Sequence, residues 1–318
     1  MNKRQTGNPG ALLSAALIIF LAMLLFSCGN GVESENRDKT VPALETVRLL
    51  AEENSKYENR ASRSTAAHAP EIKAILDRGY IVFAMTAMDQ KPFYYREENS
   101  GTLIGIDAEL AYAVANRMEV KAVFNRSAAS FDDVVTKVAN READIGLSKL
   151  SVTTHRAEIV SFSSPYIVFR QALLINRLEY AKLGSENKLP GFIRNYRGAL
   201  GVIGNSAYED YARTNFPNAS LVTYKSWGDA VDALFRGELL AIYRDEEEIH
   251  IVNTTRKDAA IMMKPVFLGD KRDSIAMAVS AEAPQLRDWL NIFLDDYLLR
   301  NRHEMTPGRL IERHFGNH

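Results

Sequence analysis

The sequence predicts an α/β fold of two hinged lobes, each with a mostly parallel sheet flanked by helices. Short apolar segments and amphipathic segments alternate from Ala69 onward, a pattern typical of strands and helices in such sheets. The alternation starts again after residue 177, and one more strand-like stretch with a long helix follows the second series. A chain that crosses twice between two lobes leaves a cleft between them, where small molecules commonly bind.

The first lobe is expected over residues 69–177. Gly79 is predicted to end a helix, because glycine is preferred just past a helix end, and Asp107 and Ser130 are predicted to cap the starts of two others. In chain order the expected elements are a helix over 71–78, a strand over 80–85, a helix over 107–118, a helix from 130, and strands over 144–147 and 172–176.

The second lobe is expected over residues 178–272. Ser206 with Glu209, and Ser226 with Asp229, have the residue types and spacing of capping boxes at helix starts. In chain order the expected elements are a strand over 200–203, a helix over 206–216, a helix from 226 that stops at 237, and a strand over 239–243. Residues 273–318 are expected to return to the first lobe, with a strand over 274–279 and a helix over 285–301.

The N-terminal segment has the layout of a secretion signal. A basic start precedes an apolar run over 11–26, and the single cysteine of the chain, Cys28, follows a small residue. This resembles a bacterial lipoprotein signal peptide over 1–27, with Cys28 acylated, palmitate included, and residues 28–68 as a lipid-anchored tether. The alternative is an uncleaved N-terminal helix, although about 16 apolar residues is short for a span that usually needs roughly 20.

Composition excludes several classes of protein. The 318 residues are 46% hydrophobic and 25% charged, as in ordinary globular proteins, and a net charge of −1 argues against a nucleic-acid partner. No phosphate-loop, dinucleotide-binding or nucleophile-elbow motif occurs, and the six histidines do not form a zinc pair, so no cofactor is expected. The acidic run over 245–248 suggests either a divalent-cation site or a solvated turn, and the solvated turn is favoured because consecutive side chains diverge.

The stretch over 146–156 contains the groups of a carboxylate receptor. Arg156 supplies a two-pronged donor, and the hydroxyls of Ser151 and Thr153 add further donors. The alternative is a helix cap beside a surface arginine. A second anion-binding set is expected at Asn205 and Ser206, although a plain capping box explains them equally well, and Asp245 ends a strand where it could pair with a cation.

Seven motifs in order resemble those of family 3 periplasmic solute-binding proteins, the amino-acid receptors of ABC importers. The similarity runs from about residue 71 to 316 and implies the type II periplasmic-binding-protein fold. The motifs are Gly-Tyr-Ile-Val at 79–82, Lys-Pro-Phe-Tyr at 91–94, Gly-Ile-Asp-Ala-Glu-Leu at 105–110, Ser-Val-Thr-Thr-His-Arg at 151–156, Phe-Ser-Ser-Pro-Tyr at 162–166, Gly-Val-Ile-Gly-Asn-Ser at 201–206, and the Gly-to-Asp spacing over 237–245.

The resemblance implies a role for several positions. Arg156 would bind the ligand's α-carboxylate with help from Ser151 and Ser206, and Asp245 would pair with the α-ammonium. Phe131 would form an aromatic wall over the ligand.

Four positions depart from the family pattern. Gln90 stands near a usual second aromatic wall, Asn205 replaces a glycine, and Leu240 replaces an aspartate. Lys149 occupies a position that is usually small, where it would either repel a ligand ammonium or attract an acidic ligand side chain.

Three functions follow from the resemblance. The first is a non-enzymatic, lipid-anchored receptor that captures a polar amino acid or close derivative for an ABC permease in the inner membrane. It would act as a monomer on the periplasmic or cell-surface side of a bacterial membrane. The second is a cyclohexadienyl-dehydratase-like enzyme on the same scaffold, with Glu246 and Glu247 near a possible general-acid position. The third is a sensory or partner-binding lipoprotein, which the long tether fits well.

Overall fold

The structure is a computed structural model that describes residues 68–183 and 189–315. The expected signal peptide over 1–27, the lipidated Cys28 and all but the last residue of the tether over 28–68 lie outside the described residues. Among the described helices, none combines the length and the apolar character that a membrane span requires.

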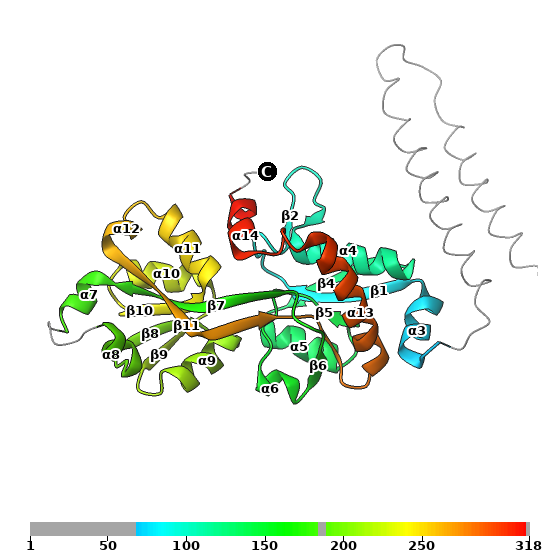
Figure 1. Cartoon of the computed structure of the whole chain (residues 1–318), viewed down its shortest axis with the longest axis horizontal. Coiled ribbons are helices and arrows are strands. Elements are labelled where there is room, and N and C mark those ends of the chain that lie inside the picture. Colours follow the sequence, from blue (N-terminus) through cyan, green and yellow to red (C-terminus); the bar gives the residue numbers. More distant parts are fainter. Residues whose placement is uncertain (1–67, 184–188, 316–318) are drawn as a thin grey trace, which may run out of the picture. The chain divides into compact units, whose positions relative to one another are not determined.

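The first lobe is built on a five-stranded sheet in the order β4-β1-β5-β12-β6 (Figure 1). The strands are β1 (Tyr80–Thr86), β4 (Lys121–Ala128), β5 (Ile145–Gly146), β6 (Val160–Phe162) and β12 (Ala278–Ser280), with a small ribbon of β2 (Tyr95–Arg96) and β3 (Leu103–Ile104). The helices are α3 (Pro70–Arg78), α4 (Ile106–Met118), α5 (Phe131–Ala139), α6 (Thr154–Ala157), α13 (Pro284–Asn301) and α14 (Pro307–His314).

The second lobe is built on a five-stranded sheet in the order β11-β7-β10-β8-β9. The strands are β7 (Ile167–Asn176), β8 (Ala199–Ile203), β9 (Ser220–Tyr224), β10 (Ala241–Asp245) and β11 (Met263–Ile275). The helices are α7 (Arg177–Ala181), α8 (Leu189–Arg194), α9 (Ala207–Asn215), α10 (Trp227–Phe235), α11 (Glu246–Thr255) and α12 (Ala259–Met262).

Both sheets are mixed, and the expectation of mostly parallel sheets is confirmed, because four of the five strands in each sheet run in the same direction. In the first, β1 pairs parallel with β4 and β5, whereas β12 pairs antiparallel with β5 and β6. In the second, β8 is parallel to β9 and β10, whereas β7 is antiparallel to β10 and β11. The single reversed strand is β12 in the first sheet and β7 in the second. The predicted α/β fold of two lobes is confirmed.

Two long strands link the lobes. β7 and β11 pair antiparallel along their length, from Ile167 opposite Ile275 to Asn176 opposite Met263, and Figure 1 shows them running from one lobe into the other. The strand expected over 172–176 is the second half of β7, and the stretch over 274–279 divides between the end of β11 and β12. The lobe boundaries expected at 177 and 272 fall just after β7 and inside β11, and they stay a prediction.

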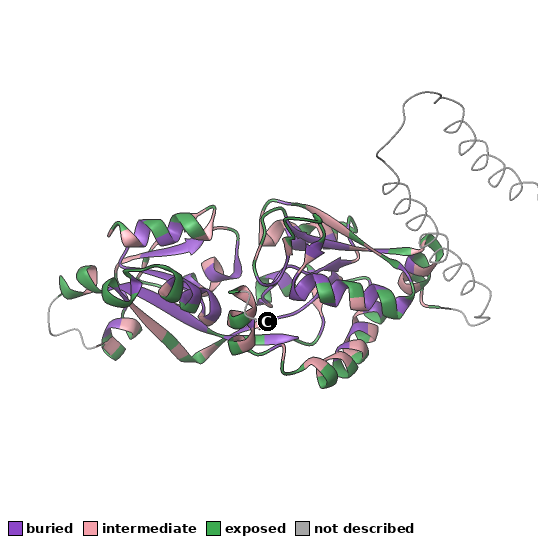
Figure 2. Cartoon of the chain, turned by 90° about the horizontal axis from the view of Figure 1, so that it is seen from above, coloured by how far each residue is buried: buried purple, intermediate pink, exposed green. Residues whose placement is uncertain are grey.

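Each lobe has its own hydrophobic core, and the buried residues line the strands and the inner faces of the helices (Figure 2). In the second lobe, adjacent residues of β7 serve opposite faces of the sheet because side chains alternate along a strand. Leu174 packs with Leu234 and Ile242 on one face, and Leu173 packs with Tyr243 on the other. The two sheets are therefore rigid supports for the loops at their strand ends.

Three predicted helix ends are confirmed. Gly79 has the left-handed φ of 73° that glycine tolerates, and its N–H donates to Ile75 O and Leu76 O at the end of α3. The Ser130 and Ser226 hydroxyls accept hydrogen bonds from Asp133 N at 3.1 Å and Asp229 N at 3.2 Å. Side-chain caps of this kind satisfy N–H groups that have no partner inside the helix.

Two other predicted caps are wrong. Gly105 caps α4, and Asp107 is instead fully buried, where it accepts hydrogen bonds from Lys149 N at 2.6 Å and Tyr166 Oη at 2.8 Å. Ser206 precedes α9, but its hydroxyl donates backward to Ile203 O at 2.7 Å and makes no cap bond. Asp107 therefore has partners that are distant along the chain, and Ser206 has a partner that precedes the helix. Neither side chain bonds to the N–H groups at the start of its own helix.

Candidate functional site

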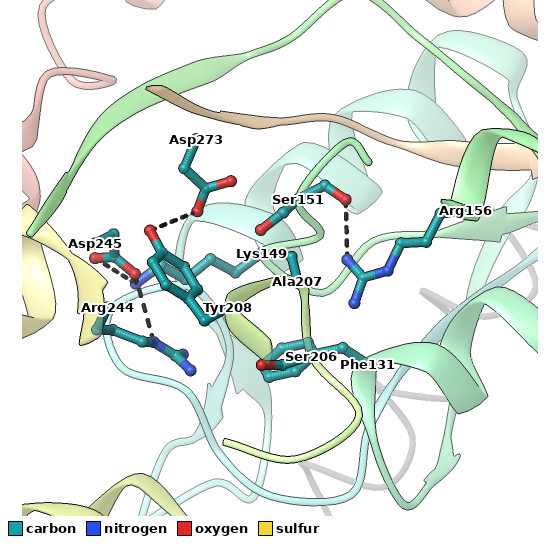
Figure 3. Close-up of a pocket in the computed structure, with 10 residues that line it drawn as sticks. All are labelled: Phe131, Lys149, Ser151, Arg156, Ser206, Ala207, Tyr208, Arg244, Asp245 and Asp273. Atoms are coloured by element: carbon teal, nitrogen blue, oxygen red, sulfur yellow. Dashed lines mark hydrogen bonds and ion pairs between the residues drawn. The ribbon is translucent and has the colours of Figure 1, made fainter. Parts of the chain in front are cut away.

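A small cavity, about 10 Å³ in volume, lies where the two lobes meet (Figure 3). The lining residues from the first lobe are Phe131, Lys149, Ser151 and Arg156; those from the second lobe and the linking strand are Ser206, Ala207, Tyr208, Arg244, Asp245 and Asp273. Six of the eight residues predicted from the sequence are therefore brought together. Gln90 and Asn205 are not among the residues that line it.

Gln90 and Asn205 belong to backbone turns. Gln90 N donates to Tyr94 O at 2.8 Å in a tight turn next to β2. Asn205 has a left-handed φ of 53°, and its N–H donates to Glu209 Oε2 at 3.0 Å. The expectation that these two side chains contact ligand stays a prediction without support from the cavity lining.

Arg156 is held in place by its own helix and by a neighbouring loop. It lies in the short helix α6, whose cap residue Thr153 accepts a hydrogen bond from Arg156 N at 3.2 Å. The guanidinium is 2% exposed, and its Nη1 donates to Ser151 O at 2.9 Å. Its Nε and Nη2 donate to Asp132 Oδ1 at 2.9 and 2.8 Å. These hydrogen bonds fix the orientation of the guanidinium.

Lys149 extends from the first lobe into an acidic pocket of the second. Its Nζ lies 2.7 Å from Glu247 Oε2, 3.2 Å from Asp245 Oδ2 and 3.3 Å from Glu248 Oε1. The Phe93 and Phe169 rings lie 4.8 and 5.3 Å from the same nitrogen. Burial alone would lower the pKa of Lys149, but the three carboxylates raise it overall, so the side chain is a fixed cation.

The acidic run over 245–248 is therefore not a solvated turn, and that prediction is wrong. Asp245 ends β10 and caps α11, accepting a hydrogen bond from Glu248 N at 3.1 Å. Glu247 is fully buried, and burial raises its pKa, whereas Glu246 is partly buried and pairs with Arg170. The run becomes buried because a helix start projects successive carboxylates toward one lysine. Among the described residues, no three or more His, Cys, Asp or Glu side chains are placed to hold a metal ion.

Arg244 was not foreseen as a site residue. It is 3% exposed and lies over the rings of Phe131, Tyr208 and Trp227 at 5.6 to 5.8 Å. Its Nε makes no hydrogen bond to the described part of the chain and lies 3.5 Å from Asp245 Oδ2. The available signal was its place beside Asp245 at the carboxyl end of a strand, where ligands bind in α/β sheets.

Asp273 and Tyr208 were also missed. Asp273 is 1% exposed on β11, and its Oδ2 accepts a hydrogen bond from Tyr208 Oη at 3.1 Å. Burial, with repulsion from Asp245, raises the pKa of Asp273 to about 6. No local sequence signal marks this residue, because it faces the cavity only once β11 has paired with β7.

Comparisons with known proteins agree with this two-lobed geometry. The family model of bacterial extracellular solute-binding proteins, family 3, matches residues 82–316. The arginine-binding periplasmic protein of Mannheimia haemolytica is 24% identical over 155 residues, which are 48% of this chain and 58% of that protein. The match therefore spans little more than half of that relative.

Two further relatives are similar over more of their length. The cyclohexadienyl dehydratase of Pseudomonas aeruginosa is 23% identical over 246 residues, 77% of this chain and 88% of that enzyme. An amino acid ABC transporter substrate-binding protein from Streptococcus pneumoniae, crystallised with L-arginine, has a TM-score of 0.61 at 24% identity, covering 77% of this chain and 98% of that one. The structural likeness shows the fold, and the family model covers most of the chain. The protein therefore belongs to the bacterial extracellular solute-binding proteins of family 3.

Proposed function

We propose that the protein is a lipid-anchored, extracytoplasmic receptor that captures a polar amino acid or close derivative between its lobes for an ABC importer. The observation that carries this proposal is the buried, oriented Arg156 guanidinium at the cavity. Two relatives named for amino-acid binding, from Mannheimia haemolytica and Streptococcus pneumoniae, support the ligand class.

Arg156 retains donors for a ligand carboxylate. An arginine side chain has five N–H donors, and the hydrogen bonds to Asp132 and Ser151 use three of them. The two that remain, one on each terminal nitrogen, suit the two oxygens of a carboxylate. Ser151 and Ser206 line the same cavity and supply hydroxyls, and Phe131 supplies an apolar wall.

An enzymatic function is the second candidate, because a cyclohexadienyl dehydratase is similar over 88% of its length. Dehydration requires a general acid within reach of the substrate. Neither sequence-predicted candidate lines the cavity: Glu246 pairs with Arg170 and Glu247 with Lys149. These positions give no support to Glu246 or Glu247 as the general acid.

A thermal-shift screen of the full-length chain in detergent tests the proposal. The screen contains amino acids, N-acetyl amino acids, small peptides, polyamines and prephenate. A ligand that binds only the native state raises the midpoint, by about RT ln(1 + [L]/Kd) in free energy. A shift with an amino acid or derivative and no turnover supports the receptor. Turnover of prephenate would establish the enzyme instead.

A further inference from the structure

Two buried carboxylates line the cavity, and they differ in their partners. Asp245 already has a cation on each side, with Lys149 Nζ at 3.2 Å and Arg244 Nε at 3.5 Å. Asp273 is hydrogen-bonded to hydroxyl groups: Tyr208 Oη at 3.1 Å, Tyr211 Oη at 3.4 Å and the Ser151 side chain. Among the ion pairs of the described residues, none involves Asp273. A buried carboxylate without a cation is electrostatically incomplete.

Asp273 is also close to the proposed carboxylate receptor. Ser151 contacts both groups, since its backbone oxygen accepts from Arg156 Nη1 at 2.9 Å and its side chain is hydrogen-bonded to Asp273. Figure 3 shows Ser151 between Asp273 and Arg156. The Arg156 guanidinium and the Asp273 carboxylate thus lie on either side of Ser151. This arrangement matches the head group of an amino acid, in which a carboxylate lies next to an ammonium.

We propose that Asp273 receives the α-ammonium of the ligand, and that Lys149 takes the place of a ligand cation at Asp245. The inference rests on the proposed function and specifies the polar contacts of that same site. A ligand ammonium at Asp245 would have to displace Lys149, which would leave a buried cation with fewer carboxylates. The same ammonium at Asp273 would give that carboxylate an ion pair and would leave the ion pairs of Lys149 in place.

The test compares two isosteric variants, Asp273→Asn and Asp245→Asn, in the full-length chain. The probe is the α-amino acid that gives the largest thermal shift with the wild type, paired with its N-acetyl derivative, and calorimetric titration gives each Kd. Asp273→Asn is expected to weaken the amino acid at least 30-fold, and Asp245→Asn less than fivefold. The N-acetyl derivative is expected to bind the wild type at least 30-fold more weakly than the amino acid.

Two further variants test whether the loss of affinity depends on the Asp273→Asn substitution alone. Asp273→Ser removes the carboxylate and keeps a hydroxyl beside Tyr208, so it should show the same loss if Asp273→Asn folds poorly. Adding Lys149→Met to Asp273→Asn removes one of the two cations beside Asp245 and is expected to restore part of the lost affinity.

The outcomes separate the inference from the proposed function. A large loss in Asp245→Asn with little change in Asp273→Asn, or equal losses in both, would overturn the role of Asp273 while leaving an amino-acid receptor. An N-acetyl derivative that binds as tightly as the amino acid would do the same. Failure of every amino acid and derivative to bind the wild type would overturn the proposed function itself, and the inference with it.

Discussion

The Lys149 ammonium of the first lobe lies 2.7 Å from the Glu247 carboxylate of the second. Both side chains are almost fully buried, and Asp245 and Glu248 complete the cluster. The lobes are therefore joined by charge at the cavity as well as by the two strands β7 and β11. In the proposed binding mode, this contact occupies Asp245 and leaves Asp273 for the ligand.

Lys149→Met should destabilise the folded chain by roughly 3–5 kcal/mol, because it leaves buried carboxylates without their shared cation. Chemical unfolding in urea measures the change. Lys73→Met is the matched control: Lys73 pairs with Asp77 on an exposed helix face, and such pairs contribute about 0–1 kcal/mol. Equal effects of the two substitutions would mean that the buried cluster adds no stability.

The affinity for an amino acid should fall in acid if Asp273 receives the ammonium. The pKa of Asp273 is raised to about 6 in a setting that also includes Asp245, Lys149, Ser151, Tyr208 and Tyr211. Since only the ionised carboxylate attracts a cation, Kd should be nearly constant above pH 7 and rise by about tenfold per pH unit well below 6. Calorimetric titration between pH 5 and 8 measures this, with Asp273→Asn as the control that lacks the dependence. A flat profile in the wild type would contradict the assignment.

Stability should decrease as the pH rises from about 4 to 7, in part because of Asp107. Burial raises the pKa of Asp107 to about 7 in the folded chain, against 3.8 for an unperturbed aspartate side chain. The folded state then binds more protons than the unfolded state between these values, so one such group lowers the unfolding free energy by up to about 1.4 kcal/mol per pH unit. Asp107→Asn should make the pH profile from urea unfolding less steep. The exposed Asp77→Asn serves as control, and a profile equally steep in both variants would exclude Asp107 as a cause.

Gly105→Ala should be far more harmful than Gly79→Ala. Both glycines have left-handed φ values, 109° and 73°, which cost other residues about 1–2 kcal/mol. A Cβ at Gly105 would also meet Pro92 O at 2.5 Å and Phe93 O at 2.6 Å, whereas a Cβ at Gly79 meets nothing within 4 Å. The expected losses are about 2–5 kcal/mol for Gly105→Ala and about 1 kcal/mol for Gly79→Ala, from thermal or urea unfolding. Similar losses would show that the turn between Pro92 and α4 can relax.

Local patterns predicted the features that depend on local contacts. Gly79, Ser130 and Ser226 end or begin helices as their residue types indicate, because their partners lie within four residues along the chain. The resemblance to a known family then indicated which strand ends meet. It located Arg156, Ser151 and Asp245 at one cavity although 89 residues separate Arg156 from Asp245.

The features that were missed depend on contacts between distant segments. Asp107 has the residue type of a helix cap, but Lys149 N and Tyr166 Oη are its partners. Glu247 appeared to belong to a solvated turn until Lys149 of the other lobe was placed beside it. Asp273 faces the cavity only because β11 pairs with β7 across the lobes. No spacing along the chain encodes these three environments.

Calorimetric titration of Arg156→Ala with the best ligand of the wild type tests the proposed function most directly. Removing the guanidinium leaves the ligand carboxylate without its two-pronged donor, so we expect a loss of affinity of at least 100-fold. Arg213→Ala is the control, since Arg213 pairs with Glu209 on the exposed side of α9, and its Kd should match the wild type. A Kd for Arg156→Ala within threefold of the wild type would contradict the assignment of the carboxylate receptor to this cavity.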